Sequence, residues 1–434
     1  ASWLVPHFEK MLYDNALLAR AYLEAFQSTR REDFAVVARD ILAYVARDLA
    51  APDGAFVSAS DADSLTPSGK REGGWFFTWT PAEVEKVLGV QNARIAKTYW
   101  AITPAGNFEG RSIPSAPLAP AEAARKLDLT EPALRAAVDA ARETLRRERA
   151  LRPPPARDDK ILTSWNGLMI SAYARASMVL AEPKHAERAE RAADFVLRVL
   201  RKDGRLLRTV KQASLPGYLD DYAFLIAGLL DLHEATGTLR WLEEAVALDR
   251  VLEAHYEDPA GGFFLTADDQ EKLLARDKPS YDGAEPSGSS VEVANLLRLH
   301  ELTTRDAYRQ RAERAVKSVG QTLASSPTSL SELLIALDFL ADVPKEIVIV
   351  TPATRAEAEP FLAKLREVFL PNAVLLVVPE GEPLAKLEAL SPLVSSKVAK
   401  GGKATAYVCE RQTCELPTND PEVFGRQLRK RPNP

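Results

Sequence analysis

The sequence predicts a mostly helical protein, a toroid of helical hairpins followed by a small C-terminal α/β domain. Three observations predict this fold. Long helical segments alternate between helices that are apolar nearly all round and helices that are apolar on one face. A glycine turn follows three of the one-sided helices. Beyond Pro344 the helical pattern gives way to short, continuously apolar segments typical of buried strands.

The alternation predicts buried inner helices, each followed by an outer helix. Residues 162–180 carry Arg175 as their one charge, whereas residues 185–200 keep their apolar side chains on one face. Three more pairs follow the same pattern: 7–26 with 32–49, 218–235 with 239–255, and 289–302 with 305–323. A lone helix is predicted at 329–340. A closed ring of six hairpins needs more helices, so we expect the missing ones upstream of Ala1, where the sequence begins inside a motif.

Glycine turns at 51–56, 201–206 and 258–264 each open a short apolar strand. A hairpin with such a turn hides its apolar face only by stacking on neighbouring hairpins. The barrel is therefore predicted to span 1–341, interrupted by an insertion at 58–157. That insertion holds a strand-like segment at 73–80, a helix begun by Thr80 and Pro81, and a charged helix at 131–149. Insertions of this length usually build a lid or a binding wall.

The C-terminal domain is predicted to span 342–434. Three apolar segments (346–350, 373–378 and 404–409) read as strands, with helices at 356–369 and from Pro421. It has no glycine-rich phosphate loop, so nucleotide binding is not supported there.

Composition excludes several classes of protein. Lys and Arg number 56 against 61 Asp and Glu, a net charge of −5, so a nucleic-acid partner is not expected. No apolar run reaches the roughly 20 residues that span a bilayer, and no leader precedes Trp3. We therefore expect no membrane partner and a cytoplasmic protein. No zinc or calcium motif is present, which predicts no metal and no cofactor.

The two cysteines, Cys409 and Cys414, fall within one six-residue window, C-E-R-Q-T-C. Two cysteines exclude a disulfide framework and a four-cysteine zinc site. The favoured interpretation is two thiols that never pair. Their closeness leaves a redox pair as the alternative.

Polar clusters stand at the heads of four predicted inner helices, at 5–15, 158–167, 218–223 and 281–288. Because each outer helix returns to the start of the next inner helix, we expect these clusters to gather on one rim of the toroid. The candidate catalytic residues there are His7, Asp159, Asp221 and Glu285. The candidate substrate-binding residues are Glu9, Tyr13, Asp61, Asp63, Trp79, Asp158, Trp165, Asn166, Asp220, Tyr222, Tyr281 and Asp282.

Carboxylates beside aromatic rings suit a sugar, whose hydroxyls need acceptors and whose C–H faces stack on rings. Hydrolysis requires two carboxyl groups, one of them with a raised pKa. The competing interpretation is helix capping, which Asp at a helix start commonly performs. In Asp158-Asp159 and Asp220-Asp221 one residue suffices as a cap, so the second of each pair is the better site candidate. Trp165 and Tyr222 fit the core at least as well as a sugar platform.

The motifs as a set resemble the family of spermatogenesis-associated protein 20 and its bacterial relatives. The resemblance is carried from Trp3 to Cys414 by W-L-V-P-H-F-E-K-M-L-Y-D-N, S-A-S-D-A-D-S, F-F-T-W-T-P, N-F-E-G, D-D-K-I-L-T-S-W-N-G-L, G-Y-L-D-D-Y-A, D-G-A-E-P-S-G-S-S and A-Y-V-C-E-R-Q-T-C. It implies a six-hairpin-glycosidase-like barrel preceded by a thioredoxin-like domain that bears a Cys-x-x-Cys. This sequence contains no such segment, so that domain is expected as a partner in a longer chain. The resemblance implies no settled reaction.

The predicted function is a carbohydrate-active or carbohydrate-binding barrel with hydrolase-like chemistry at the rim carboxylates and a sugar-like ligand. One alternative is a redox scaffold linked to the thioredoxin-like domain, with exchange through Cys409 and Cys414. Another is a sugar epimerase-like isomerase, which the supply of only five histidines disfavours. A third is a barrel without activity that serves protein interaction. Whether the protein is an enzyme stays open on the sequence.

Overall fold

The computed structural model describes residues 5–210, 215–271 and 274–430, so Trp3 and Leu4 of the first motif lie outside the described residues. The chain divides into two compact units. Unit 1 comprises residues 1–11 and 59–158, and unit 2 comprises residues 12–58 and 159–434. Within the described ranges, no helix combines the length and apolar character that a membrane crossing requires.

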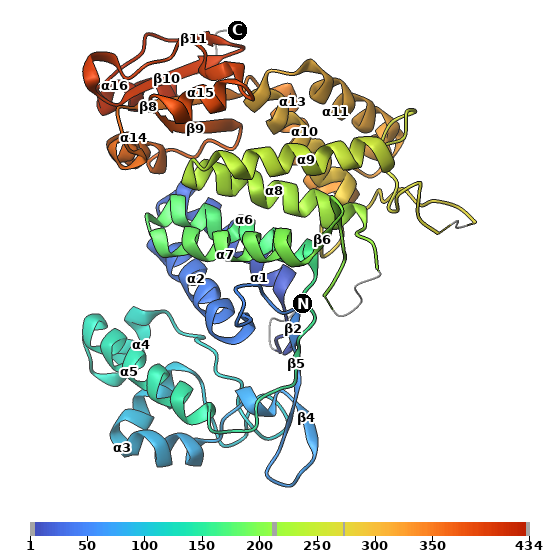
Figure 1. Cartoon of the computed structure of the whole chain (residues 1–434). Coiled ribbons are helices and arrows are strands. Elements are labelled where there is room, and N and C mark those ends of the chain that lie inside the picture. The colour runs from blue at the N-terminus through green and yellow to red at the C-terminus, as the bar shows by residue number, and fades with distance from the viewer. Residues whose placement is uncertain (1–4, 211–214, 272–273, 431–434) are drawn as a thin grey trace. The chain divides into compact units, whose positions relative to one another are not determined.

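Unit 2 is built from helical hairpins, as the alternation predicts (Figure 1). Its inner helices are α1 (Leu12–Thr29), α6 (Thr163–Leu180), α8 (Leu219–Thr236), α10 (Gly288–Thr303) and α13 (Ser331–Ala341). Each of the first four packs against the helix that follows it: α2 (Glu32–Tyr44), α7 (Pro183–Val199), α9 (Leu239–His255) and α11 (Asp306–Ser318). The inner helices also contact one another in chain order, from α1 through α6, α8 and α10 to α13. The fold is therefore mostly α and follows the path of an (α/α) toroid.

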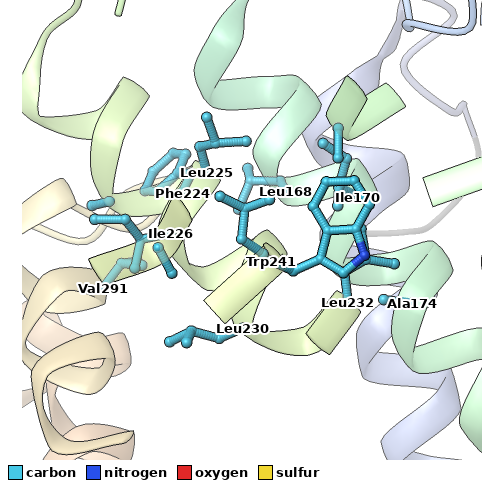
Figure 2. Close-up of a cluster of buried hydrophobic side chains, with 14 of the residues drawn as sticks. Leu168, Ile170, Ala174, Phe224, Leu225, Ile226, Leu230, Leu232, Trp241 and Val291 are labelled. Atoms are coloured by element: carbon cyan, nitrogen blue, oxygen red, sulfur yellow. The ribbon is translucent and has the colours of Figure 1, made fainter. Parts of the chain in front are cut away.

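The core lies between these inner helices. Figure 2 shows Leu168 and Ile170 of α6 beside Phe224 and Leu225 of α8, with further side chains from α9 and α10. All are buried, and burial of a large apolar side chain contributes about 1.5–3 kcal/mol.

Two glycines let α6 and α8 approach closely. A Cβ at Gly167 would lie 2.5 Å from the Phe224 carbonyl carbon, and a Cβ at Gly228 would lie 2.6 Å from the Gly167 oxygen. Only hydrogen fits at these two positions, so the sequence fixes where the two inner helices cross.

The C-terminal segment forms a four-stranded sheet in the order β11-β10-β8-β9. The strands are β8 (Lys345–Thr351), β9 (Ala373–Pro379), β10 (Thr405–Glu410) and β11 (Thr413–Cys414). β8 pairs in parallel with β9 and antiparallel with β10. One face packs under α14 (Glu359–Arg366) and α16 (Pro421–Arg429), and the other joins the helical core, so β8 is buried throughout. The short helix α15 (Glu382–Glu388) follows β9.

Unit 1 holds a small sheet, β1-β2-β5, with strands Lys10–Met11, Ala59–Ser60 and Arg157–Asp158. A hairpin of β3 (Asp63–Leu65) and β4 (Arg71–Gly73) precedes three helices, α3 (Pro81–Tyr99), α4 (Pro120–Leu127) and α5 (Glu131–Arg149). Thr80 caps α3 as predicted, since its side chain accepts from Glu83 N.

Two predictions of local structure are wrong. The helix predicted from His7 begins at Leu12, because Lys10 and Met11 pair with β2 instead. The strand-like segment at 73–80 contains a 3-10 turn, Trp75–Phe77, because Gly74 adopts a left-handed φ of 78° that turns the chain. Apolar side chains at every position suit either a buried strand or a packed turn, and pattern alone does not separate them.

Candidate functional site: the helix-start rim of unit 2

The starts of the inner helices meet at one end of unit 2, and we call this end the rim. Four links join them in order. Tyr13 of α1 contacts Trp165 of α6 with ring centroids 4.9 Å apart. Ser164 N of α6 donates to Asp221 of α8 at 3.0 Å. Gly288 N of α10 donates to Asp220 at 2.9 Å. Asp282, before α10, accepts from backbone N–H groups at the start of α13.

Asp221 joins two helix starts. It accepts from Ser164 N at 3.0 Å and from Tyr218 N at 2.8 Å, and Arg208 Nη1 lies 3.4 Å from its second oxygen. The side chain is fully buried, and burial raises its pKa to about 6 despite the nearby Arg208 guanidinium. These contacts are those of a buried cap.

Asp282 joins two further helix starts. One oxygen accepts from Ser287 N at 2.8 Å, and the other accepts from Glu332 N at 2.9 Å and Leu333 N at 3.3 Å. The carboxylate is buried and lies at the positive ends of α10 and α13, where negative charge is stabilised. Like Asp221, it is held in place by backbone donors.

Asp220 and Glu285 are the partly exposed carboxyls of the rim. Glu285 Oε2 accepts from Trp165 Nε1 at 2.7 Å, and Asp220 accepts from the backbone N–H of Gly288. Burial raises the pKa of both, and the pKa of Glu285 is raised further by the charges of Asp220 and Asp14. The charge of Arg208 lowers both pKa values. Its guanidinium carbon lies 4.7 Å from the centre of the Tyr218 ring. Two interacting carboxyls with raised pKa values, one arginine and an indole thus share the rim.

The aromatic candidates divide by exposure. Trp165 is half-buried, with its edge against Tyr13 and its nitrogen bonded to Glu285. Tyr281 is 68% exposed. Tyr222 is fully buried, and its hydroxyl accepts from Leu206 N at 2.8 Å, so it is a core residue. Asn166 is buried too and binds both backbone groups of Phe56.

Six of the candidate residues belong to unit 1: His7, Glu9, Asp61, Asp63, Trp79 and Asp158. His7 is 74% exposed, with Nε2 3.9 Å from Glu9 Oε2. Asp61 accepts from Arg71 at 2.9 Å and from Asp63 N at 3.2 Å. Trp79 is buried beneath Arg152, whose guanidinium carbon lies 4.0 Å from the ring centre.

Asp158, the sixth, pairs with Ala59 between β5 and β2. Its neighbour Asp159 opens the second segment of unit 2 and is exposed.

The structure joins Cys409 and Cys414 in a disulfide, so the favoured interpretation of two unpaired thiols is wrong. Arg411 and Gln412, with φ of 50° and 64°, form a two-residue turn between β10 and β11. That turn sets the two cysteines directly opposite each other in the ladder. The turn type depends on these two positive φ angles. Arg and Gln are not residue types that indicate such angles, so the sequence did not predict the turn.

Sequence reasoning missed Arg208 and left Asp14 out of the candidate set. Arg208 lies just after the glycine turn at 201–206, and its only signal was closeness to the next helix start. His255, Asp268 and Asp269 form the group in the described part of the chain that could hold a metal ion. Asp269 also receives two bonds from Arg205, at 2.8 and 3.0 Å, which makes an ordinary ion-pair cluster the simpler description.

A cavity of about 950 Å³ lies away from the rim, at the other ends of the inner helices and beside α14. Two arginines of its lining are paired, Arg20 with Glu24 at 3.1 Å and Arg175 with the buried Asp231 at 3.2 Å. None of the predicted site residues lines it.

Solved structures show a partial likeness to the chain. A D-mannose isomerase has a TM-score of 0.36 at 13% identity, covering 72% of this chain and 76% of its own. A family 105 glycoside hydrolase of C. acetobutylicum has a TM-score of 0.35 at 11% identity, covering 76% and 82%. At such scores the likeness supports no statement about activity.

No family model matches the chain. Curated relatives do match. The human spermatogenesis-associated protein 20 is 34% identical over 96% of this chain and 58% of its own length, and the mouse protein is 33% identical over 96% and 57%. This chain therefore spans somewhat more than half the length of these relatives. Across 96% of its residues this chain is a homologue of spermatogenesis-associated protein 20.

Proposed function

We propose that the rim of unit 2 is a carbohydrate site with glycosidase-like chemistry. The observation that carries the proposal is the pair of partly exposed, mutually interacting carboxyls, Asp220 and Glu285, both with raised pKa values. The pair lies beside an indole and a guanidinium. Hydrolysis of a glycosidic bond needs one carboxyl that holds a proton and one that is charged.

Glu285 is the better candidate for the acid. Burial raises its pKa, and the charges of Asp220 and Asp14 raise it further, so it keeps its proton to higher pH than an ordinary glutamate. Asp220 would then be the charged partner, since Gly288 N and Arg208 both favour its ionised form.

Binding would use the remaining rim groups. Trp165 and the exposed Tyr281 offer ring faces to the C–H groups of a sugar, and Arg208 offers N–H donors to its hydroxyls. Asp221 and Asp282 would serve this site indirectly, because they hold the helix starts together.

An epimerase-like reaction has less support. His185, His233, His255 and His300 lie in unit 2, none of them is a partner in the rim contacts described above, and His7 lies in unit 1. Proton abstraction beside a carbonyl near neutral pH would therefore depend on a carboxyl group alone.

The test is titration calorimetry of the protein against a panel of neutral, acidic and amino sugars, with aryl glycosides as substrates for turnover. Glu285→Gln should abolish turnover while retaining binding to within about tenfold, because Gln keeps the bond from Trp165 but cannot donate an acidic proton. The matched control is Glu187→Gln, an exposed glutamate of α7 at the cavity away from the rim, which should change neither. Failure of every sugar to bind the wild-type protein would refute the proposal.

A further inference from the structure

The disulfide of Cys409 and Cys414 has one accessible sulfur. Cys414 is exposed in β11, whereas Cys409 is fully buried in β10, on the sheet face that joins the helical core. A thiolate from outside therefore meets Cys414, and the electrons of the broken bond would pass to a sulfur without access to water.

A buried carboxyl stands on the same face as Cys409. Glu346 in β8 is the direct antiparallel partner of Cys409, and paired residues point their side chains to the same side, with Cβ atoms about 4.5–5.5 Å apart. Glu346 is only 2% exposed. Its Oε1 accepts from Gln412 N at 3.1 Å, so the turn of the disulfide hairpin itself holds the carboxyl in place.

A second carboxyl, that of Glu301 from α10, lies close to Glu346. Glu346 Oε2 is buried without a hydrogen-bond donor, and the Glu301 side chain is within hydrogen-bonding range of the Glu346 carboxyl. A bond between two carboxyls requires a proton on one of them. Burial raises the pKa of both, and the charge of Glu301 helps to bring that of Glu346 to about 7.

The surrounding positive charges only partly offset the rise in these two pKa values. Lys397 acts on Glu346 and Arg309 acts on Glu301, and each favours the ionised carboxyl. Burial lowers the pKa of Lys397 itself. Lys345 and Glu410 pair with each other at the next ladder position, where side chains point to the opposite face.

We propose that Cys409 and Cys414 form a thiol–disulfide exchange site in which the Glu346 and Glu301 carboxyl pair gives a proton to the buried leaving sulfur. The co-reactant is a dithiol, small or carried by another protein. This inference is independent of the carbohydrate proposal, because it uses residues of β8, β10, β11 and α10 and none of the rim residues.

The exchange balances as follows. The thiolate of the dithiol attacks Cys414 Sγ, the bond between the two cysteines breaks, and its electron pair goes to Cys409 Sγ, which takes the proton of the carboxyl pair. The second thiol of the reductant then attacks the mixed disulfide and releases Cys414 as a thiol. The proton of this second thiol goes to Cys414, and the proton that the first thiol lost on becoming a thiolate passes through solvent and restores the carboxyl pair. The dithiol is oxidised to a disulfide, and the protein disulfide is reduced to two thiols.

The carboxyl pair makes the exchange rate fall with rising pH, whereas ionisation of the attacking thiol makes it rise. Above about pH 7 the carboxyl pair loses its proton, and Cys409 would have to leave as a buried thiolate beside negative charge, which is costly. The rate constant per attacking thiolate should therefore fall as pH rises through about 7.

The experiment measures reduction of the oxidised full chain by dithiothreitol from about pH 5.5 to about pH 9, with thiols counted by a gel shift after maleimide–polyethylene glycol trapping. Glu346→Gln, a neutral side chain of the same shape, should react at least about tenfold more slowly below pH 7, with no step in its profile. Glu410→Gln, on the same hairpin but the opposite face, should follow the wild type. Thermal melting of each variant checks that it folds.

A second measurement tests the direction of attack. With oxidised glutathione as the disulfide reagent, the Cys414 thiol of Cys409→Ser should form a mixed disulfide and release one reduced glutathione, whereas Cys414→Ser should leave a Cys409 thiol that reacts with this reagent only after unfolding. A Glu346→Gln profile identical to that of the wild type would overturn the proton transfer. A disulfide that dithiothreitol reduces only on unfolding would overturn the exchange site itself.

Discussion

Asp221→Asn should remove a loss of stability that the wild type undergoes between acid and neutral pH. The pKa of Asp221 is raised by burial from 3.8 to about 6, so the folded state holds this proton more tightly than the unfolded chain does. The resulting stabilisation is complete below about pH 4 and is lost as pH rises through about 6. A difference of about two pKa units, at 1.36 kcal/mol each, amounts to about 3 kcal/mol.

Asn resembles the protonated form of Asp in charge and shape, so the variant escapes this loss. Urea unfolding followed by tryptophan fluorescence, at pH values from about 4 to about 8, should show the free energy of unfolding of the variant gaining about 3 kcal/mol on that of the wild type. Asn166→Ala is the control, because Asn166 is an equally buried polar side chain that cannot titrate. A difference between Asp221→Asn and wild type that stays constant over this range would refute the reasoning.

Two further predictions concern buried charges of unit 2. Asp282→Ala leaves three backbone N–H groups at the starts of α10 and α13 without an acceptor, so urea unfolding should show a loss of about 2–4 kcal/mol, against less than about 0.5 kcal/mol for Ala at the exposed neighbour Tyr281. Asp231→Ala removes the buried partner of Arg298, 2.8 Å away, and of Arg175, so it should cost about 3–5 kcal/mol in the same assay. A loss below about 1 kcal/mol in either variant would mean that water or a neighbour replaces the missing oxygen.

The helices of this protein could be predicted closely because their signals are local. The helix α9, Leu239–His255, and the helix α5, Glu131–Arg149, begin and end where the periodicity predicts. Each has a threonine at its start, Thr238 and Thr130, and one apolar face. Where the partner is distant in sequence, prediction failed. Lys10 and Met11 leave the helix of α1 because β2, some fifty residues on, offers them a ladder.

The site could be predicted only as a set of residues. The sequence places two aspartates at the start of α8 and favours the second, but the structure buries Asp221 among backbone donors and leaves Asp220 partly exposed beside Glu285. Adjacent helical residues differ by about 100° in direction, so the phase of α8 against α6 and α10 decides their environments. That phase is set by packing contacts such as Gly167 against Phe224, which no local pattern reveals.

The ladder pairing of Ala59 with Asp158 gives this architecture a natural grafting point. Although about a hundred residues separate the two positions along the chain, they lie roughly 5 Å apart across the ladder. A segment of any length inserted between these two positions begins and ends at the same two neighbouring points of the ladder. Length variation among homologues can therefore accumulate there at little energetic cost to the hairpins, and a tight turn is the minimal replacement.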